Sequence, residues 1–270
     1  MLTASTLAAA AVCVLETATE KVALTKEIAE AWRSGGITEV GSANLPARPA
    51  RPIRPEVKLP RDMPKRRIGS AAGRARLLHA LAHIELNAID LAWDLVARFA
   101  GENLPREFFD DWVSVAQEEA THHQMICARL AAYGVAYGDF PAHDGLWQAA
   151  EETAHDLLAR LAVVPLVLEA RGLDVTPALI ARMREQQDEE SAAVLKQVYA
   201  DEIRHVAAGR RWFEHVCRVR RLAPVAEWQR LVRRHFKGVL KPPFNDAARS
   251  AAGLGRDFYE PLARQGSQRI

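Results

Sequence analysis

The feature that most constrains this fold is a pattern of glutamate and histidine that occurs twice at nearly the same spacing. Glu85 precedes Glu119 by 34 residues, and Glu169 precedes Glu202 by 33 residues. Each of the later glutamates is followed three residues on by a histidine. Residues at i and i+3 project from the same face of a helix, so each carboxylate and imidazole can reach one cation.

The two histidines of this pattern are His122 and His205, and a third Glu-x-x-His motif is formed by Glu152 and His155. In a chain with nine histidines, one such motif is expected by chance. A lone glutamate on one helix, then Glu-x-x-His on the next, repeated once, is the ligand arrangement of carboxylate-bridged two-metal four-helix bundles.

The composition favours helices throughout. Apolar residues make up 49% of the 270 residues and aromatic residues only 7%, and no segment shows the alternation of Val, Ile and Thr that is typical of a strand. We therefore predict an all-α protein, with one elaborated helical domain rather than two equal ones.

The chain is expected to fall into four segments: an amino-terminal helical segment (1–36), a proline-rich arm (37–70), a four-helix bundle (71–221) and a carboxy-terminal helical extension (222–270). The first segment reads as one helix from Leu2 to Arg33, or two broken near Thr19. The arm has prolines at 46, 49, 52, 55, 60 and 64. That density forbids helix and favours extended backbone.

The bundle helices are predicted at about 71–100, 105–133, 148–171 and 188–221. A long crossover (135–147) joins the second to the third, and a short helix (177–186) precedes the fourth. Gly172 is expected to end the third helix, with Thr176 and Pro177 starting the short one. Pro165 predicts a kink one turn before Glu169.

Hard carboxylate oxygens with one imidazole per metal suit two iron or two manganese ions and leave coordination positions open. We expect Glu119 and Glu202 to bridge the metals, with His122 and His205 each binding one. Glu85 and Glu169 would be terminal ligands. Six buried titratable groups without a cation would be very costly.

Several neighbours have expected supporting roles. Glu118 and Asp201 directly precede the bridging glutamates and are placed to accept hydrogen bonds from the ligand histidines. Tyr199, one turn from Glu202, would be a core tyrosine, a partner of a ligand or a redox residue. Because Glu169 is predicted near the end of its helix, Glu152 and His155 remain alternative ligands.

Three features bear on compartment and partners. Cys13, Cys127 and Cys217 match neither a disulfide framework nor a zinc site, which indicates a reducing cytoplasm. No apolar run approaches 18 residues, so no membrane span is expected. Residues 203–241 contain eleven Arg or Lys against two Glu, which is typical of a solvated face, a homodimer contact or a polyanion surface.

The runs LLHALAHIELNAIDLAWDLVARF, EEATHH, YGDFPAHDGLW, LEARGLDVTP and DEIRHVAAGRRWF resemble a family of bacterial ferritin-like proteins, domain of unknown function 455. The likeness covers nearly the whole chain. That family is similar in ligand pattern to the tRNA-hydroxylating di-iron monooxygenases of the ferritin-like superfamily. The resemblance implies a ferritin-like bundle and places the ligand roles on the six residues already singled out.

We hypothesise an oxidoreductase that activates oxygen to hydroxylate or desaturate an unknown small-molecule substrate and takes electrons from a donor. The alternatives are a metal-storage or peroxide-detoxifying protein, a tRNA-modifying hydroxylase, and a helical module with a structural metal. Against peroxide detoxification, the chain has no Cys-x-x-Cys module to deliver electrons.

Overall fold

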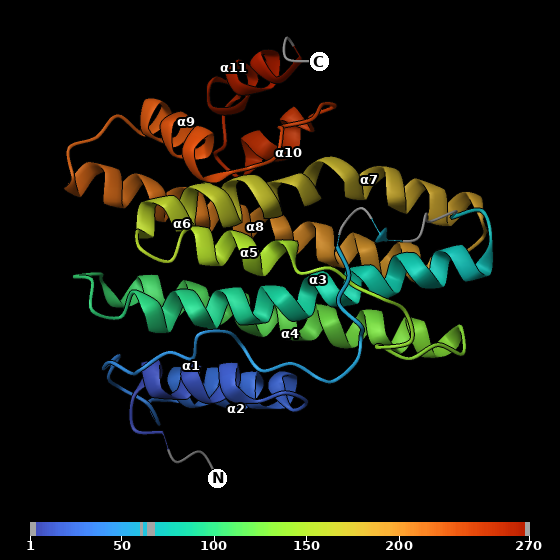
Figure 1. The fold of residues 1–270 in the computed structure, drawn as a ribbon, viewed down its shortest axis with the longest axis horizontal. Coiled ribbons are helices and arrows are strands. Elements are labelled where there is room, and N and C mark those ends of the chain that lie inside the picture. Colours follow the sequence, from blue (N-terminus) through green and yellow to red (C-terminus); the bar gives the residue numbers. More distant parts are fainter. Residues whose placement is uncertain (1–3, 60–61, 64–67, 268–270) are drawn as a thin grey trace. The chain divides into compact units, whose positions relative to one another are not determined.

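The computed structural model describes residues 4–59, 62–63 and 68–267. In this part of the chain the regular secondary structure is helical, with no β-strand and a single isolated bridge between Val57 and Ala142 (Figure 1). The predicted all-α class is confirmed. The chain forms two compact units, residues 1–147 and 148–270, and the four predicted segments stay a prediction.

The first unit begins with a short helical hairpin. Of the two alternatives for the amino-terminal segment, the broken one is confirmed: α1 (Leu7–Glu16) and α2 (Lys21–Ser34) are separate helices. The start predicted at Leu2 lies outside the described residues. Gly35 ends α2 in the left-handed conformation, with φ of 81°, which glycine adopts without steric cost.

Two long helices form the centre of this unit. They are α3 (Ala71–Arg98) and α4 (Arg106–Ala132), close to the predicted bounds. They pack against each other along their length, with α1 against α3 and α2 against α4 (Figure 1). A buried ion pair fixes the hairpin, because Lys21 Nζ lies 2.6 Å from Asp90 Oδ1 on α3.

The proline-rich arm crosses this unit in extended backbone. Ala50 N–H donates to the Leu15 carbonyl, and Val57 pairs with Ala142 in the crossover. Arg51 lies 3.3 Å from the second oxygen of Asp90. The arm therefore connects the hairpin to the crossover. Residues 60–61 and 64–67 of the predicted arm lie outside the described residues.

The second unit is built on one long helix and a second helical run with a distorted turn. The long helix is α8 (Glu189–Val219), as predicted. The run consists of α6 (Leu157–Val163), the π-helix η2 (Val164–Glu169) and α7 (Ala170–Glu185), all packed on α8. Pro165 lies in the first turn of η2, so the predicted disturbance occurs there as a wide turn.

The predicted third helix is wrong at both ends. It does not run unbroken from residue 148, because α5 (Gly145–Glu152) ends in a turn and Asp156 starts α6 by accepting a hydrogen bond from Leu158 N–H. It does not end at Gly172 either. The helix continues through Gly172 and Pro177 to Glu185, and the separate short helix predicted at 177–186 does not exist.

Packing explains why α7 passes through these two residues. A helical glycine costs only about 1 kcal/mol relative to alanine, and α7 buries Leu173, Ile180 and Met183 while packing on α8. Tertiary contacts therefore outweigh local propensity. As a result, Glu169 lies in the middle of a helical run, as Glu85 does in α3.

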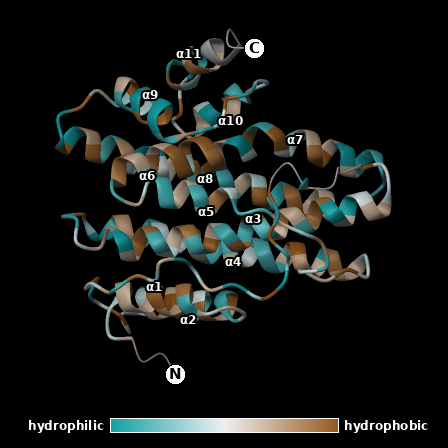
Figure 2. Ribbon diagram, viewed as in Figure 1, coloured by the Kyte–Doolittle hydropathy of each residue, from teal (hydrophilic) through white to brown (hydrophobic). Residues whose placement is uncertain are grey.

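Three further helices cover this unit: α9 (Pro224–His235), α10 (Asp246–Ala251) and α11 (Arg256–Ser267). Helix α9 is amphipathic and buries Trp228, Leu231 and Val232. Figure 2 shows apolar residues interspersed with polar ones along the helices of both units. Among the described residues, none of the helices has the length and apolar content needed to cross a bilayer.

Candidate metal site

In the first unit, helices α3 and α4 bring three of the predicted ligands together. Ligand atoms of Glu85, Glu119 and His122 all lie within 4.8 Å of one another. His122 Nδ1 is 3.4 Å from Glu119 Oε2 and 3.6 Å from Glu85 Oε2. All three side chains are almost completely buried. Two carboxylates and one imidazole at this separation can converge on a single cation.

The electrostatics of this triad favour a positive charge. Burial, followed by repulsion from Glu119, raises the pKa of Glu85 to about 8. Burial alone would lower the pKa of His122, but hydrogen bonds and attraction from Glu119 and Glu85 outweigh it and raise that pKa to about 11. The metal-free triad thus retains protons, and a divalent cation would replace them.

In the second unit, Glu202 and His205 lie on one face of α8. His205 Nδ1 is 4.0 Å from Glu202 Oε2. The side chain of His205 is 1% exposed and that of Glu202 is 12% exposed. Glu169 is the last residue of η2, which packs directly on α8. The same residue types at the same spacing therefore occur in each unit.

The supporting residues have partners of their own. The Tyr199 hydroxyl accepts a hydrogen bond of 2.8 Å from Asn245 Nδ2. Asp201 Oδ2 accepts one of 2.8 Å from Gln197, and its other oxygen pairs with Arg204 at 2.6 Å. The predicted hydrogen bonds from ligand histidines to Glu118 and Asp201 stay predictions.

Comparison with known proteins identifies the family. A family model described as "Protein of unknown function (DUF455)" matches residues 15–260. The chain belongs to the DUF455 family. An "Uncharacterized protein" of Haemophilus influenzae is 40% identical over 217 residues, which cover 78% of this chain and 74% of that protein. No solved structure matches the chain.

The alternative ligands of this DUF455 chain, Glu152 and His155, do not share a helix. Glu152 ends α5 and His155 lies in the following turn, where it is exposed. The side chain of Glu152 pairs with Lys237 at 2.8 Å, and the ring of His155 lies against that of His235. The prediction that His155 lies inside the third helix is therefore wrong, because α6 begins only after it.

Sequence reasoning missed a group of histidines around Tyr137. His83 accepts a hydrogen bond from the Tyr137 hydroxyl at 2.8 Å and donates one to the His143 carbonyl at 3.2 Å. Burial, together with the charge of Arg51, lowers the pKa of His83 to about 3. These hydrogen bonds hold the crossover against α3. The i, i+4 pair of His79 and His83 was the available signal.

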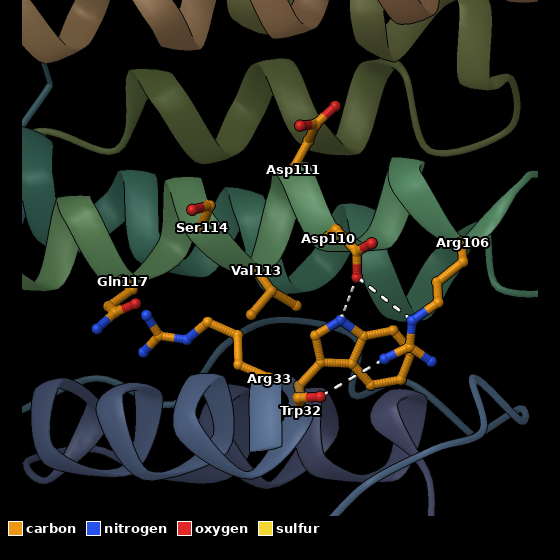
Figure 3. A pocket seen from close by; sticks show the side chains of 8 residues that line it. All are labelled: Trp32, Arg33, Arg106, Asp110, Asp111, Val113, Ser114 and Gln117. Atoms are coloured by element: carbon orange, nitrogen blue, oxygen red, sulfur yellow. Dashed lines mark hydrogen bonds and ion pairs between the residues drawn. The ribbon is translucent and has the colours of Figure 1, made fainter. Parts of the chain in front are cut away.

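A hollow of about 470 Å³ lies between α2 and α4, and none of its lining residues is a predicted ligand (Figure 3). Trp32 Nε1 donates to Asp110 at 2.7 Å, and the Arg106 guanidinium stacks on the Trp32 ring at 3.8 Å. Arg106 also donates to the Thr38 carbonyl. These contacts attach α2 to α4.

Proposed function

We propose that this DUF455 protein is a ferritin-like di-iron or di-manganese oxidoreductase that uses dioxygen to hydroxylate or desaturate a small organic substrate. The observation that carries the proposal is the buried group of Glu85, Glu119 and His122, whose carboxylates lie close enough to share one cation. The repeated spacing, with Glu169, Glu202 and His205 in the second unit, supports two metals per chain.

The residues present fit such metals. Carboxylate oxygens with a single imidazole per triad suit iron or manganese better than a thiolate or a many-histidine site would. When bound, such metals supply oxygen activation at open coordination positions. The bridging role of Glu119 and Glu202 and a ferritin-like arrangement of the helices belong to the proposal and follow from the ligand pattern.

The chain's own residues would set up the site. Helices α3 and α4 hold the first triad in a buried environment that raises the pKa of Glu85 to about 8, so Glu85 keeps its proton at neutral pH until a cation replaces it. Hydroxylation with dioxygen places one oxygen atom in the substrate and reduces the other to water, which consumes two electrons and two protons. The proposal therefore requires an external electron donor.

The basic region favours a small substrate over tRNA. Three of its arginines are paired within the second unit: Arg210 with Glu214 at 2.5 Å, Arg220 with Asp156 at 2.8 Å and Arg230 with Glu227 at 2.6 Å. Arg210 also stacks on Phe258. Charges neutralised in this way contribute little to phosphate binding. A tRNA titration at two salt concentrations tests this choice, since steeply salt-dependent binding would favour the RNA.

Anaerobic loading with Fe²⁺ followed by exposure to dioxygen tests the proposal. We expect binding to saturate at about two irons per chain, by the ligand count of such sites, with oxygen consumed once per loaded centre. Loading should be lost in the Glu119→Ala, Glu202→Ala double variant and kept when the exposed Glu107 and Glu190 are changed to alanine. Accumulation of many irons per chain would instead indicate storage, and no oxygen consumption would exclude the oxidoreductase.

A further inference from the structure

The third Glu-x-x-His motif packs against the end of α9 and includes none of the residues of the metal site proposed above. The rings of His155 and His235 have centroids 5.2 Å apart. His235 Nδ1 lies 3.9 Å from Glu152 Oε1. One carboxylate from the end of α5 and two imidazoles, from the following turn and the end of α9, thus lie near one another within the second unit.

His235, the buried member of this group, has a ring nitrogen without a hydrogen bond. His235 is only 7% exposed, and its Nδ1 has no hydrogen-bond partner. A buried polar atom left in this way typically costs about 1–3 kcal/mol. Because Nδ1 is the atom that faces the Glu152 carboxylate, the unsatisfied nitrogen points into the group.

The positive charge now beside Glu152 is replaceable. Lys237 Nζ is 2.8 Å from Glu152 Oε2, and the lysine side chain is 82% exposed. An exposed ion pair contributes little to stability, and a flexible ammonium can move into water at small cost. The nearby carboxylate of Asp156 is already engaged by Arg220, so it competes weakly for an incoming cation.

We infer that Glu152, His155 and His235 bind a divalent metal of the zinc class. Two histidines and one glutamate, with a fourth position for water, form a recurrent zinc ligand set. Binding requires Lys237 to leave and the side chains to draw together to ligand distances of about 2.0–2.2 Å. The metal then joins the turn before α6 to the end of α9 and so holds α9 in place.

Zinc titration of the full chain carrying Glu119→Ala and Glu202→Ala tests the inference, because this background lacks the metal centre proposed above. We expect one zinc per chain in this background. Adding His155→Ala or His235→Ala should each weaken zinc binding by more than about 10-fold, since mutating even a residue that only hydrogen-bonds a ligand lowers metal affinity by about that factor. His155 is exposed, so its substitution does not disturb the core.

Two further variants sharpen the result. Lys237→Met should tighten zinc binding, because it removes the competing cation. His215→Ala changes a histidine of α8 that is outside the group, and it should leave zinc binding unchanged. Cobalt substitution should give the absorption bands of a site with nitrogen and oxygen ligands. No zinc bound in the background, or zinc retained in both histidine variants, would overturn the inference, whatever the outcome for the iron centre.

Discussion

Gly209 of α8 approaches Pro165 of η2 so closely that a Cβ added to the glycine would lie 2.4 Å from the proline Cβ. Real Cβ atoms do not come that near to another carbon, so only glycine allows this approach. Gly209 is one helical turn beyond His205, and Pro165 is one turn before Glu169. The glycine therefore sets the separation of η2, which carries Glu169, from α8, which carries Glu202 and His205.

Gly209→Ala is expected to push α8 away from η2 and to draw His205 apart from Glu169. Overpacking of this kind typically costs about 1–3 kcal/mol. We predict a lower melting temperature and the loss of about one of the two metals per chain proposed for such sites. Calorimetry and metal analysis measure the two effects.

Gly172→Ala is the matched control. Gly172 lies inside α7 with no atom within 4 Å of an added Cβ. Alanine there should stabilise the protein by up to about 1 kcal/mol and leave the metal count unchanged. Equal metal content in both glycine variants would contradict the role given to Gly209.

The pH dependence of the metal-free protein should report Glu85. Its pKa is raised from 4.5 to about 8 in the folded state, so its stabilising contribution is complete below pH 4.5 and is lost as the pH rises to 8. Glu85→Gln imitates the protonated form and removes this loss. We predict that the variant gains stability relative to the wild type by about 1.4 kcal/mol per pH unit over this window.

Chemical denaturation of chelator-treated protein at pH 5, 6, 7 and 8 measures this difference. The comparison applies up to pH 8, because Glu85 also helps to raise the pKa of His122 to about 11. At higher pH the variant therefore titrates His122 over a different range from the wild type. A stability difference that does not change with pH would contradict the protonated state of Glu85.

The buried ion pair of Lys21 and Asp90 should hold the amino-terminal hairpin on α3. Both side chains are at most 1% exposed. Asp90→Ala leaves the lysine charge buried, and we expect a loss of about 3–5 kcal/mol. The Lys21→Met, Arg51→Met, Asp90→Leu triple variant should recover most of it, because Arg51 also pairs with Asp90. Urea unfolding measures both, and a triple variant as unstable as Asp90→Ala would show that shape rather than charge is limiting.

The first unit was the easier to predict from sequence. Ser70 accepts from Gly73 N–H at the start of α3, and Pro105 immediately precedes α4, so the helix bounds follow from local signals. Glu85 and His122 lie within uninterrupted helices. The i, i+3 spacing of Glu119 and His122 therefore placed that pair on one face of α4, and the structure brings Glu85 of α3 to it.

The second unit was harder because packing outweighs local signals. Gly172 and Pro177 are typical of helix ends, yet contacts with α8 keep α7 helical through both. The break at Thr153 to Asp156 carried a readable signal, since Asp156 directly precedes the apolar run LLARLAV and caps it. The partnership of His155 with His235 had none, because it depends on how α9 returns to the turn before α6.

Metal analysis of protein purified without added chelator tests the central claim most directly. We predict about two iron or manganese ions per chain in the wild type, by the ligand count of such sites, and almost none in the Glu119→Ala, Glu202→Ala double variant. The zinc inferred at His235 is counted separately by element. The account would be contradicted if both proteins contained less than about half an iron or manganese ion per chain, against the two that the ligand count requires.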